Sequence, residues 1–215
     1  MIAEFVAVAV IAYLLGSIPF GLITGKLKSG VDVREHGSGK TGATNVMRTV
    51  GTKLGVLVLV LDVVKATVAV MLAAIIMGRG SGVLTIGGIS VYWQHVAQVV
   101  AGLAAVAGHN WPVFAKFKGG RGVTAYFGTI FALFPPAGIL GAEVVAIAAL
   151  RSRHMSVGSL LGALATLCLM LPLTIAYKLL PPIYLVYGSV VTALIAYQHR
   201  DNIKRLRQGT ERRLW

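Results

Sequence analysis

Apolar runs of about 20 residues recur along the whole sequence. A helix of that length crosses the ~30 Å hydrocarbon core of a bilayer, where the backbone must satisfy its own hydrogen bonds. The mean hydropathy of +0.79 and the hydrophobic share of 56% fit such a chain better than a water-soluble domain. We therefore predict an all-α, polytopic integral membrane helical bundle that forms a single domain over residues 1–215.

Five helices are predicted by the apolar runs themselves, at roughly 2–24, 54–77, 83–107, 157–177 and 181–198. The stretch 123–150 exceeds one ordinary span, and Pro135-Pro136 interrupt it. Two short helices that form a hairpin fit this stretch best and give about seven transmembrane helices. A single re-entrant unit also fits and gives five. The first run has no basic region before it, so we expect a retained helix rather than a signal peptide.

The net charge of +13 raises the possibility of nucleic-acid binding, but the positions of the cations favour a membrane explanation. Of the 20 Lys and Arg residues, six lie in 26–53, three in 108–121, two in 151–154 and six in 199–215. The alternate loops contain Arg79 and Lys178, and Lys65 lies inside a predicted helix. The positive-inside rule places the four basic segments in the cytoplasm, with the N-terminus outside and the C-terminus inside.

The first basic segment, "REHGSGKTGATNVMRTVG" at 34–51, combines glycines with Ser38, Thr41, Asn45 and Arg48. Glycine lets backbone N–H groups converge on an anion, and arginine adds a pair of donors. The segment partly matches a nucleotide-binding P-loop, but Arg34 stands where that motif requires its first glycine. A flexible loop that touches lipid headgroups explains the composition equally well.

The second basic segment ends in a glycine turn directly before the helix predicted from residue 123. This turn holds Lys118, Gly119, Gly120, Arg121 and Gly122. A helix N-terminus presents unpaired N–H groups and a positive dipole end, so the turn is predicted to bind phosphate. His109, earlier in the same segment, is more readily explained as a structural residue than as a catalytic one.

The other two basic segments give weaker signals. Ser156 and Ser159 lie on one face at the start of a helix, where serine is also a common cap. His199 and Asn202 share a face beyond the last apolar run, next to a basic stripe that can rest on lipid phosphates. The single cysteine, Cys168, permits no internal disulfide and no cysteine-based metal site.

Asp62 and Lys65 lie three residues apart within the second apolar run. That spacing lets them pair on one helix face, which avoids an uncompensated charge inside the membrane. The pair fits either a structural lock or one wall of a polar cavity.

Five ordered blocks resemble the bacterial acyl-phosphate:glycerol-3-phosphate acyltransferases, the PlsY family. These blocks are "GSIPFG" at 16–21, "GSGKTGATNVMR" at 37–48, "DVVK" at 62–65, "GHNWPVFAKFKGGRGV" at 108–123 and "HRDNIKRL" at 199–206. Two positions differ from the family pattern, because Lys40 stands where asparagine is usual and Arg121 where lysine is usual. Arginine is a planar fork and lysine a mobile point charge, so the second change alters geometry but not charge.

The resemblance implies a seven-helix enzyme of the bacterial cytoplasmic (inner) membrane with its active site facing the cytoplasm. Such an enzyme transfers a fatty acyl group from acyl phosphate to the 1-hydroxyl of glycerol 3-phosphate. Its expected partners are these two substrates and the lipid bilayer, with no nucleic acid and no obligate protein partner. Because acyl phosphate is already activated, we expect no cofactor and no metal.

The resemblance also assigns roles to individual residues. The expected catalytic residues are Ser38, Arg48, His199 and Asn202. The expected substrate-binding residues are Thr41, Asn45, Lys118, Gly119, Gly120, Arg121, Gly122, Ser156 and Ser159. The general base stays open between His199 and the leaving phosphate.

Two other functions are compatible with parts of the sequence. A transporter or channel for a phosphorylated solute would also use several helices with polar residues, although the cations here gather on one side. An acyltransferase that uses acyl-CoA or acyl carrier protein commonly carries H-x-x-x-x-D. None of the five histidines has an aspartate five residues later.

Overall fold

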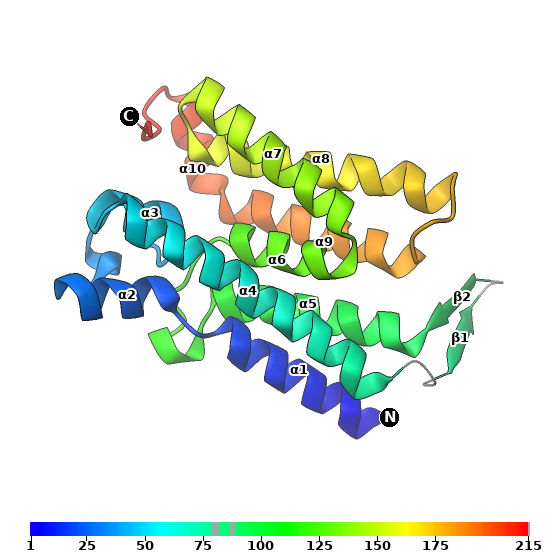
Figure 1. Ribbon diagram of the computed structural model, residues 1–215. Coiled ribbons are helices and arrows are strands. Elements are labelled where there is room, and N and C mark those ends of the chain that lie inside the picture. Colours follow the sequence, from blue (N-terminus) through cyan, green and yellow to red (C-terminus); the bar gives the residue numbers. More distant parts are fainter. Residues whose placement is uncertain (79–81, 87–88, 215) are drawn as a thin grey trace.

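The computed structural model describes residues 1–78, 82–86 and 89–214, so Arg79 lies outside the described residues. The long helices run side by side along one axis (Figure 1). In chain order the elements are α1 (Ile2–Gly16), α2 (Phe20–Ser29), η1 (Val33–Glu35), α3 (Ala43–Thr49), α4 (Thr52–Met77), β1 (Val83–Ile86), β2 (Ile89–Tyr92), α5 (Trp93–Asn110), η2 (Val113–Ala115), α6 (Val123–Leu133), α7 (Pro135–Ser152), α8 (Met155–Ile175), α9 (Pro182–Gln198) and α10 (Arg200–Arg207).

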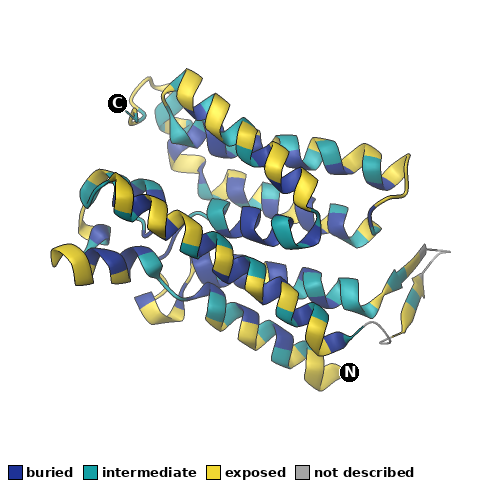
Figure 2. Cartoon of the chain, viewed as in Figure 1, coloured by how far each residue is buried: buried dark blue, intermediate teal, exposed yellow. Residues whose placement is uncertain are grey.

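Three helical segments are long and apolar enough to cross a membrane: Ile2–Ser29, Thr52–Met77 and Met155–Ile175. Val123–Leu133 and Pro182–Gln198 are shorter apolar helices. Exposed residues follow the outward faces of α4 and α7 (Figure 2). On α4 these include Val56, Val60, Val64 and Ile75, so the bundle presents apolar side chains where a soluble protein would present polar ones. The prediction of a mainly helical integral membrane protein is confirmed.

The first predicted helix, 2–24, is in fact two helices with a break at 17–19. Pro19 disfavours helical geometry at the residue before it, so α1 ends at Gly16 and α2 starts at Phe20. Gly16 packs directly against the carbonyl of Ala105 on α5, where no side chain would fit. At the break the carbonyl of Ile18 accepts the N–H of Phe20 at 3.1 Å and has a second lone pair for a donor from another element.

The helix predicted at 83–107 begins only at Trp93, because Val83–Ile86 and Ile89–Tyr92 pair as two antiparallel strands instead. Val83 pairs with Tyr92, and the hydroxyl groups of Thr85 and Ser90 lie 3.0 Å apart across the strands. The all-α prediction was therefore wrong for this segment. Its β-branched residues satisfy a strand as readily as a helix, and hydropathy does not distinguish the two.

The stretch 123–150 forms two helices, α6 and α7, as the proline pair predicts. Pro135 occupies the first position of α7, where a missing N–H group has no cost. The side chains of Tyr126 on α6 and Tyr187 on α9 are fully buried in the core. The hydroxyl of Tyr187 forms a hydrogen bond with that of Thr129, so α6 lies at the centre of the bundle (Figure 1).

The segments between the long helices divide between the two ends of the bundle. α2, α3, η2, the α7–α8 turn and α10 lie at one end, and the N-terminus and the strands β1 and β2 lie at the other (Figure 1). All four basic segments of the sequence therefore meet at the same end of the molecule.

Candidate functional site

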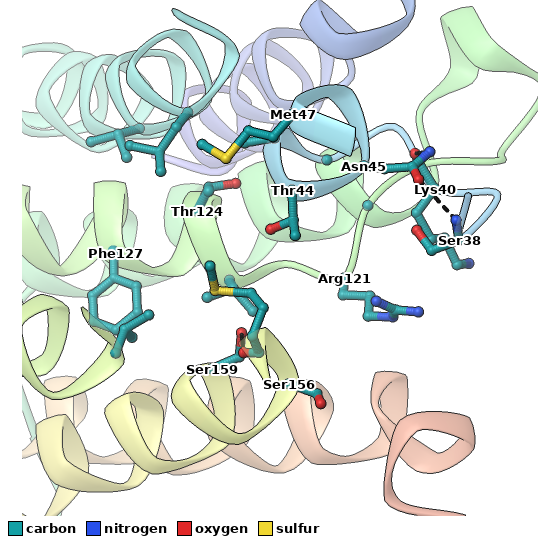
Figure 3. Close-up of a pocket in the computed structure, with 18 of the residues that line it drawn as sticks. Ser38, Lys40, Thr44, Asn45, Met47, Arg121, Thr124, Phe127, Ser156 and Ser159 are labelled. Carbon is teal, nitrogen blue, oxygen red and sulfur yellow. Dashed lines mark hydrogen bonds between the residues drawn. The ribbon is translucent and has the colours of Figure 1, made fainter. Parts of the chain in front are cut away.

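A cavity of about 560 Å³ opens at the end of the bundle where the basic segments meet. Nine of the residues predicted for the site line it: Ser38, Asn45, Arg48, Gly120, Arg121, Ser156, Ser159, His199 and Asn202. Ser38, Lys40 and Arg121 lie toward one end of the cavity in Figure 3, and Phe127 lies toward the other. Residues far apart in the sequence thus share one basin.

Asn45 builds the first wall of the cavity. Its side-chain nitrogen donates hydrogen bonds to the carbonyls of Val33, His36 and Lys40, at 2.7, 3.2 and 2.9 Å. Its side-chain oxygen accepts from the backbone N–H of Ser38 at 2.8 Å. This fully engaged amide shapes the loop, so Asn45 supports the site rather than offering free donors to a substrate.

The loop around Asn45 also depends on glycine. Gly37 and Gly39 have φ values of +58° and +68°, in the left-handed region that side chains disfavour. A side chain on Gly37 would collide with the side-chain oxygen of Asn45. The glycines of this segment therefore form a tight loop around one amide.

The glycine turn forms the second wall. The backbone N–H of Gly120 donates to the carbonyl of His109 at 3.0 Å, and that of Thr41 donates to the carbonyl of Gly119 at 3.5 Å. Gly122 is left-handed, with φ +85°, and no side chain caps the start of α6 behind it. The N-terminus of α6 therefore stays available to an anion at this wall.

Four of the predicted binding residues do not line the cavity. Thr41, Gly119 and Gly122 form its supporting backbone, whereas the side chain of Lys118 is exposed outside it. Of the two predicted cations in the glycine turn, the structure brings Arg121 to the cavity.

Three cations face the cavity: Lys40, Arg48 and Arg121. Within the described parts of the chain, none of the three has a carboxylate within 4.0 Å. Burial lowers the pKa of each one, and neighbouring cations lower it further. Three partly desolvated positive charges without a partner make a basin that favours an anion.

Glu211, in the C-terminal tail, is a cavity residue that the sequence did not reveal. Its carboxylate accepts hydrogen bonds from Ser156 at 3.0 Å, Asn202 at 2.6 Å and Arg205 at 2.7 Å. Burial would raise the pKa of Glu211, but these three donors together lower it. The signal available in the sequence was a single acidic residue within the basic segment that follows α10. Glu211 thereby connects α8, α10 and the C-terminal tail along one wall of the cavity.

His199 follows α9 and is 2% exposed. Its Nδ1 lies 2.8 Å from the carbonyl of Ile195, which can only accept, so Nδ1 carries the proton and Nε2 is left as an acceptor. Burial lowers the pKa of His199 to about 4, and the charge of Arg121 acts in the same direction. The ring is therefore neutral at physiological pH and able to accept a proton.

The far part of the cavity is apolar. Leu59, Val60, Val63 and Val64 of α4 line it, together with Val123, Phe127 and Phe131 of α6 and Ala142, Val145 and Ala146 of α7. Val60 and Val64 are each 48% exposed, so this part borders the outer surface of the bundle. The cavity thus joins a cationic basin to an apolar groove beside the lipid.

Known proteins share both the sequence and this architecture. A family model described as glycerol-3-phosphate acyltransferase matches residues 6–209. The chain belongs to the glycerol-3-phosphate acyltransferase family. It is 48% identical over 214 residues to glycerol-3-phosphate acyltransferase 3 of Dehalococcoides mccartyi, covering 100% of this chain and 97% of that one.

Two solved structures of PlsY, described as an integral membrane glycerol 3-phosphate acyltransferase, superpose closely on this member of the family. The glycerol 3-phosphate form has a TM-score of 0.82 and 39% sequence identity, and the lysophosphatidic acid form has 0.80 and 38%. In both comparisons 97% of this chain matches 94% of the other. The resemblance to the PlsY family seen in the sequence is confirmed.

Proposed function

We propose that this acyltransferase transfers a fatty acyl group from acyl phosphate to the 1-hydroxyl of glycerol 3-phosphate, giving lysophosphatidic acid and inorganic phosphate. This would be the first acylation step of bacterial phospholipid synthesis. One observation carries the proposal: a basin of three cations, which have no carboxylate within 4.0 Å among the described residues, continues into an apolar groove. Such a cavity suits two phosphorylated substrates, one of which has a long acyl tail.

The two substrates divide the cavity by their chemistry. The glycine turn with Arg121 holds the phosphate of glycerol 3-phosphate, while Lys118 adds attraction from outside. Ser38 and Arg48 hold the acyl phosphate headgroup, on a loop that Asn45 and Thr41 keep in shape. The acyl chain stays in the apolar groove, so it never has to enter water.

The reaction requires positioning and charge stabilisation more than chemical activation. The 1-hydroxyl oxygen attacks the acyl carbonyl carbon, a new ester C–O bond forms, and the C–O bond to phosphate breaks. Arg48 and the hydroxyl of Ser38 stabilise the negative charge that develops on the carbonyl oxygen and the leaving phosphate. Asn202 lies beside Ser156 at the same wall and orients the glycerol.

The proton of the attacking hydroxyl needs an acceptor. The free Nε2 of His199 is one, and an oxygen of the leaving phosphate is the other. Because acyl phosphate is a mixed anhydride, the balanced reaction consumes no cofactor. Among the described residues no group of three or more His, Cys, Asp or Glu side chains could hold a metal ion.

We further propose that the cavity faces the cytoplasm of a bacterial inner membrane and that about seven helices span it. The charge distribution in the sequence supports an outer N-terminus and a cytoplasmic C-terminus. The continuous core that α1, α4, α5, α6, α8 and α9 share supports one domain over residues 1–215. Neither a nucleic acid nor an obligate protein partner is needed for this reaction.

The deciding experiment incubates purified protein with labelled glycerol 3-phosphate and each acyl donor in turn: acyl phosphate, acyl-CoA and acyl carrier protein. We expect lysophosphatidic acid from acyl phosphate alone. Product from acyl-CoA but not acyl phosphate would overturn the donor assignment. Uptake of glycerol 3-phosphate into sealed vesicles without any acylation would favour transport instead.

A further inference from the structure

A buried ionic cluster lies directly beneath the cavity. Oδ1 of Asp62 on α4 is 2.7 Å from Nζ of Lys65 and 3.6 Å from Nδ1 of His109 at the end of α5. The side chains of all three are 3–4% exposed. The predicted pairing of Asp62 with Lys65 is confirmed, and His109 joins that pair.

Lys65 turns away from the cavity. Its ammonium group donates to the carbonyl of Ile18 at 2.7 Å and lies 5.6 Å from the centre of the Phe20 ring. Lys65 therefore fastens the break between α1 and α2. It does not line the cavity.

His109 lines the cavity and contacts the glycine turn. Its carbonyl accepts the N–H of Gly120, and its ring nitrogen Nε2 faces the α-carbon of Gly120 so closely that a side chain there would collide with it. A side chain on Gly119 would likewise collide with the carbonyl of His109. The position of the turn is thus set by the position of His109.

A buried carboxylate is stable only where charged or polar partners compensate it, so it restricts the groups around it to few arrangements. Asp62 is the single carboxylate within 4.0 Å of His109 in the described chain. The imidazole of His109 also packs against Gly120. A substitution at Asp62 is therefore expected to displace the glycine turn through the side chain of His109.

We propose that Asp62 is a positioning residue for substrate binding: acting through His109, it fixes the glycine turn in the conformation that holds phosphate. This inference rests on the proposed role of the turn in binding glycerol 3-phosphate. Asp62 itself touches no substrate.

The test measures the affinity of the purified protein for glycerol 3-phosphate by calorimetry, independently of turnover. Asp62→Asn and His109→Gln should each weaken binding by roughly 10-fold, because small displacements of a positioning group have large effects. The double variant should bind no more weakly than His109→Gln alone, since residues that act in series are not additive. In assays, the KM for glycerol 3-phosphate should rise while kcat and the KM for acyl phosphate stay unchanged.

Lys65→Met is the matched control, because it removes the other partner of Asp62 but leaves the contact with His109. It should lower thermal stability without weakening binding. Equal weakening by Lys65→Met, additive effects in the double variant, or normal binding by both single variants would overturn the proposal.

The test distinguishes loss of folding from loss of positioning, and binding from turnover. His109→Gln retains the Asp62–Lys65 pair, so it gives a folded test if Asp62→Asn is unstable. A wild-type protein that binds glycerol 3-phosphate but forms no lysophosphatidic acid contradicts the proposed function, whereas the positioning role is decided by binding alone.

Discussion

Asn202 donates a hydrogen bond to the carboxylate of Glu211 at 2.6 Å, which draws the C-terminal tail against the wall of the cavity. We expect Glu211→Ala to reduce turnover by roughly 10- to 100-fold, since hydrogen bonds to a charged group contribute about 1.5–3 kcal/mol each. Glu211→Gln keeps one acceptor oxygen, so its turnover should lie between that of wild type and that of Glu211→Ala. Glu143→Gln, an exposed position on α7, is the control, and a fully active Glu211→Ala would contradict this role.

The pH dependence of kcat/KM tests whether His199 is the base. A base works when deprotonated, and burial holds the pKa of His199 at about 4, so activity that depends on it should persist down to about pH 5 and fall below that. His199→Asn should reduce the rate and remove this acid limb. If the acid side of the kcat/KM profile is unchanged in His199→Asn, the phosphate of the substrate, and not His199, accepts the proton.

The same pKa predicts how stability changes with pH. Between the ordinary histidine pKa of about 6.5 and the folded value of about 4, the unfolded chain binds a proton at position 199 that the folded chain does not. This residue therefore lowers the free energy of unfolding as pH falls through that window. Thermal denaturation at several pH values should show that the stability of wild type, relative to that of His199→Asn, falls as the pH is lowered through this window.

Lys40 lines the cavity together with Arg48 and Arg121 and is the third cation of the basin. Lys40→Asn should raise the KM for a phosphorylated substrate by roughly 3- to 10-fold. It should also weaken the dependence of that KM on ionic strength, because one of the charges that attract the phosphate, and that salt screens, has been removed. Lys53→Asn removes an exposed cation outside the cavity and serves as the control. Equal effects of the two substitutions would point to general electrostatic attraction.

Arg48 lines the cavity and makes one long hydrogen bond, at 3.4 Å, to the carbonyl of Arg213. Arg48→Ala should lower kcat by roughly 100- to 1,000-fold, the range seen when one donor to a developing charge is removed. Arg151→Ala removes an exposed arginine at the end of α7 for comparison. Near-normal turnover by folded Arg48→Ala would refute the assigned role.

The apolar groove should control which acyl chains are used. Val63→Phe adds volume to the groove and should shift the preference, measured as kcat/KM, toward shorter acyl phosphates. Val68→Phe lies on the same helix but does not line the cavity, so it should leave the preference unchanged. A parallel loss for all chain lengths would mean that Val63 affects folding rather than selection.

Hydropathy predicted most of the helices, because it is averaged over many residues. The strand pair β1–β2 was missed, because the Val and Ile residues of these strands are as hydrophobic as those of a membrane helix. The Gly-Gly pair at 87–88 of the sequence is typical of a hairpin and was the available signal. The break before α2 left a signal in Pro19, which local rules recognise and average hydropathy does not.

The site was predictable where a motif carries its own chemistry, and less so where a contact joins distant segments. Nine of the predicted residues line the cavity, but sequence spacing gave no sign that Glu211 meets Ser156 or that His109 meets Asp62. Asn45 was expected to help bind phosphate, which stays a prediction, whereas its four hydrogen bonds to the loop could not be foreseen from the sequence. Such contacts depend on tertiary packing, which a single sequence does not encode locally.

The exposed valines at the border of the apolar groove affect how the reaction should be measured. If the acyl chain of the donor enters the groove sideways from the bilayer, enzyme and donor meet by diffusion within the membrane plane. The effective concentration of the donor is then its mole fraction in the membrane. Adding inert phospholipid to mixed micelles should therefore slow the enzyme by surface dilution at constant bulk donor, while the water-soluble acceptor follows ordinary solution kinetics.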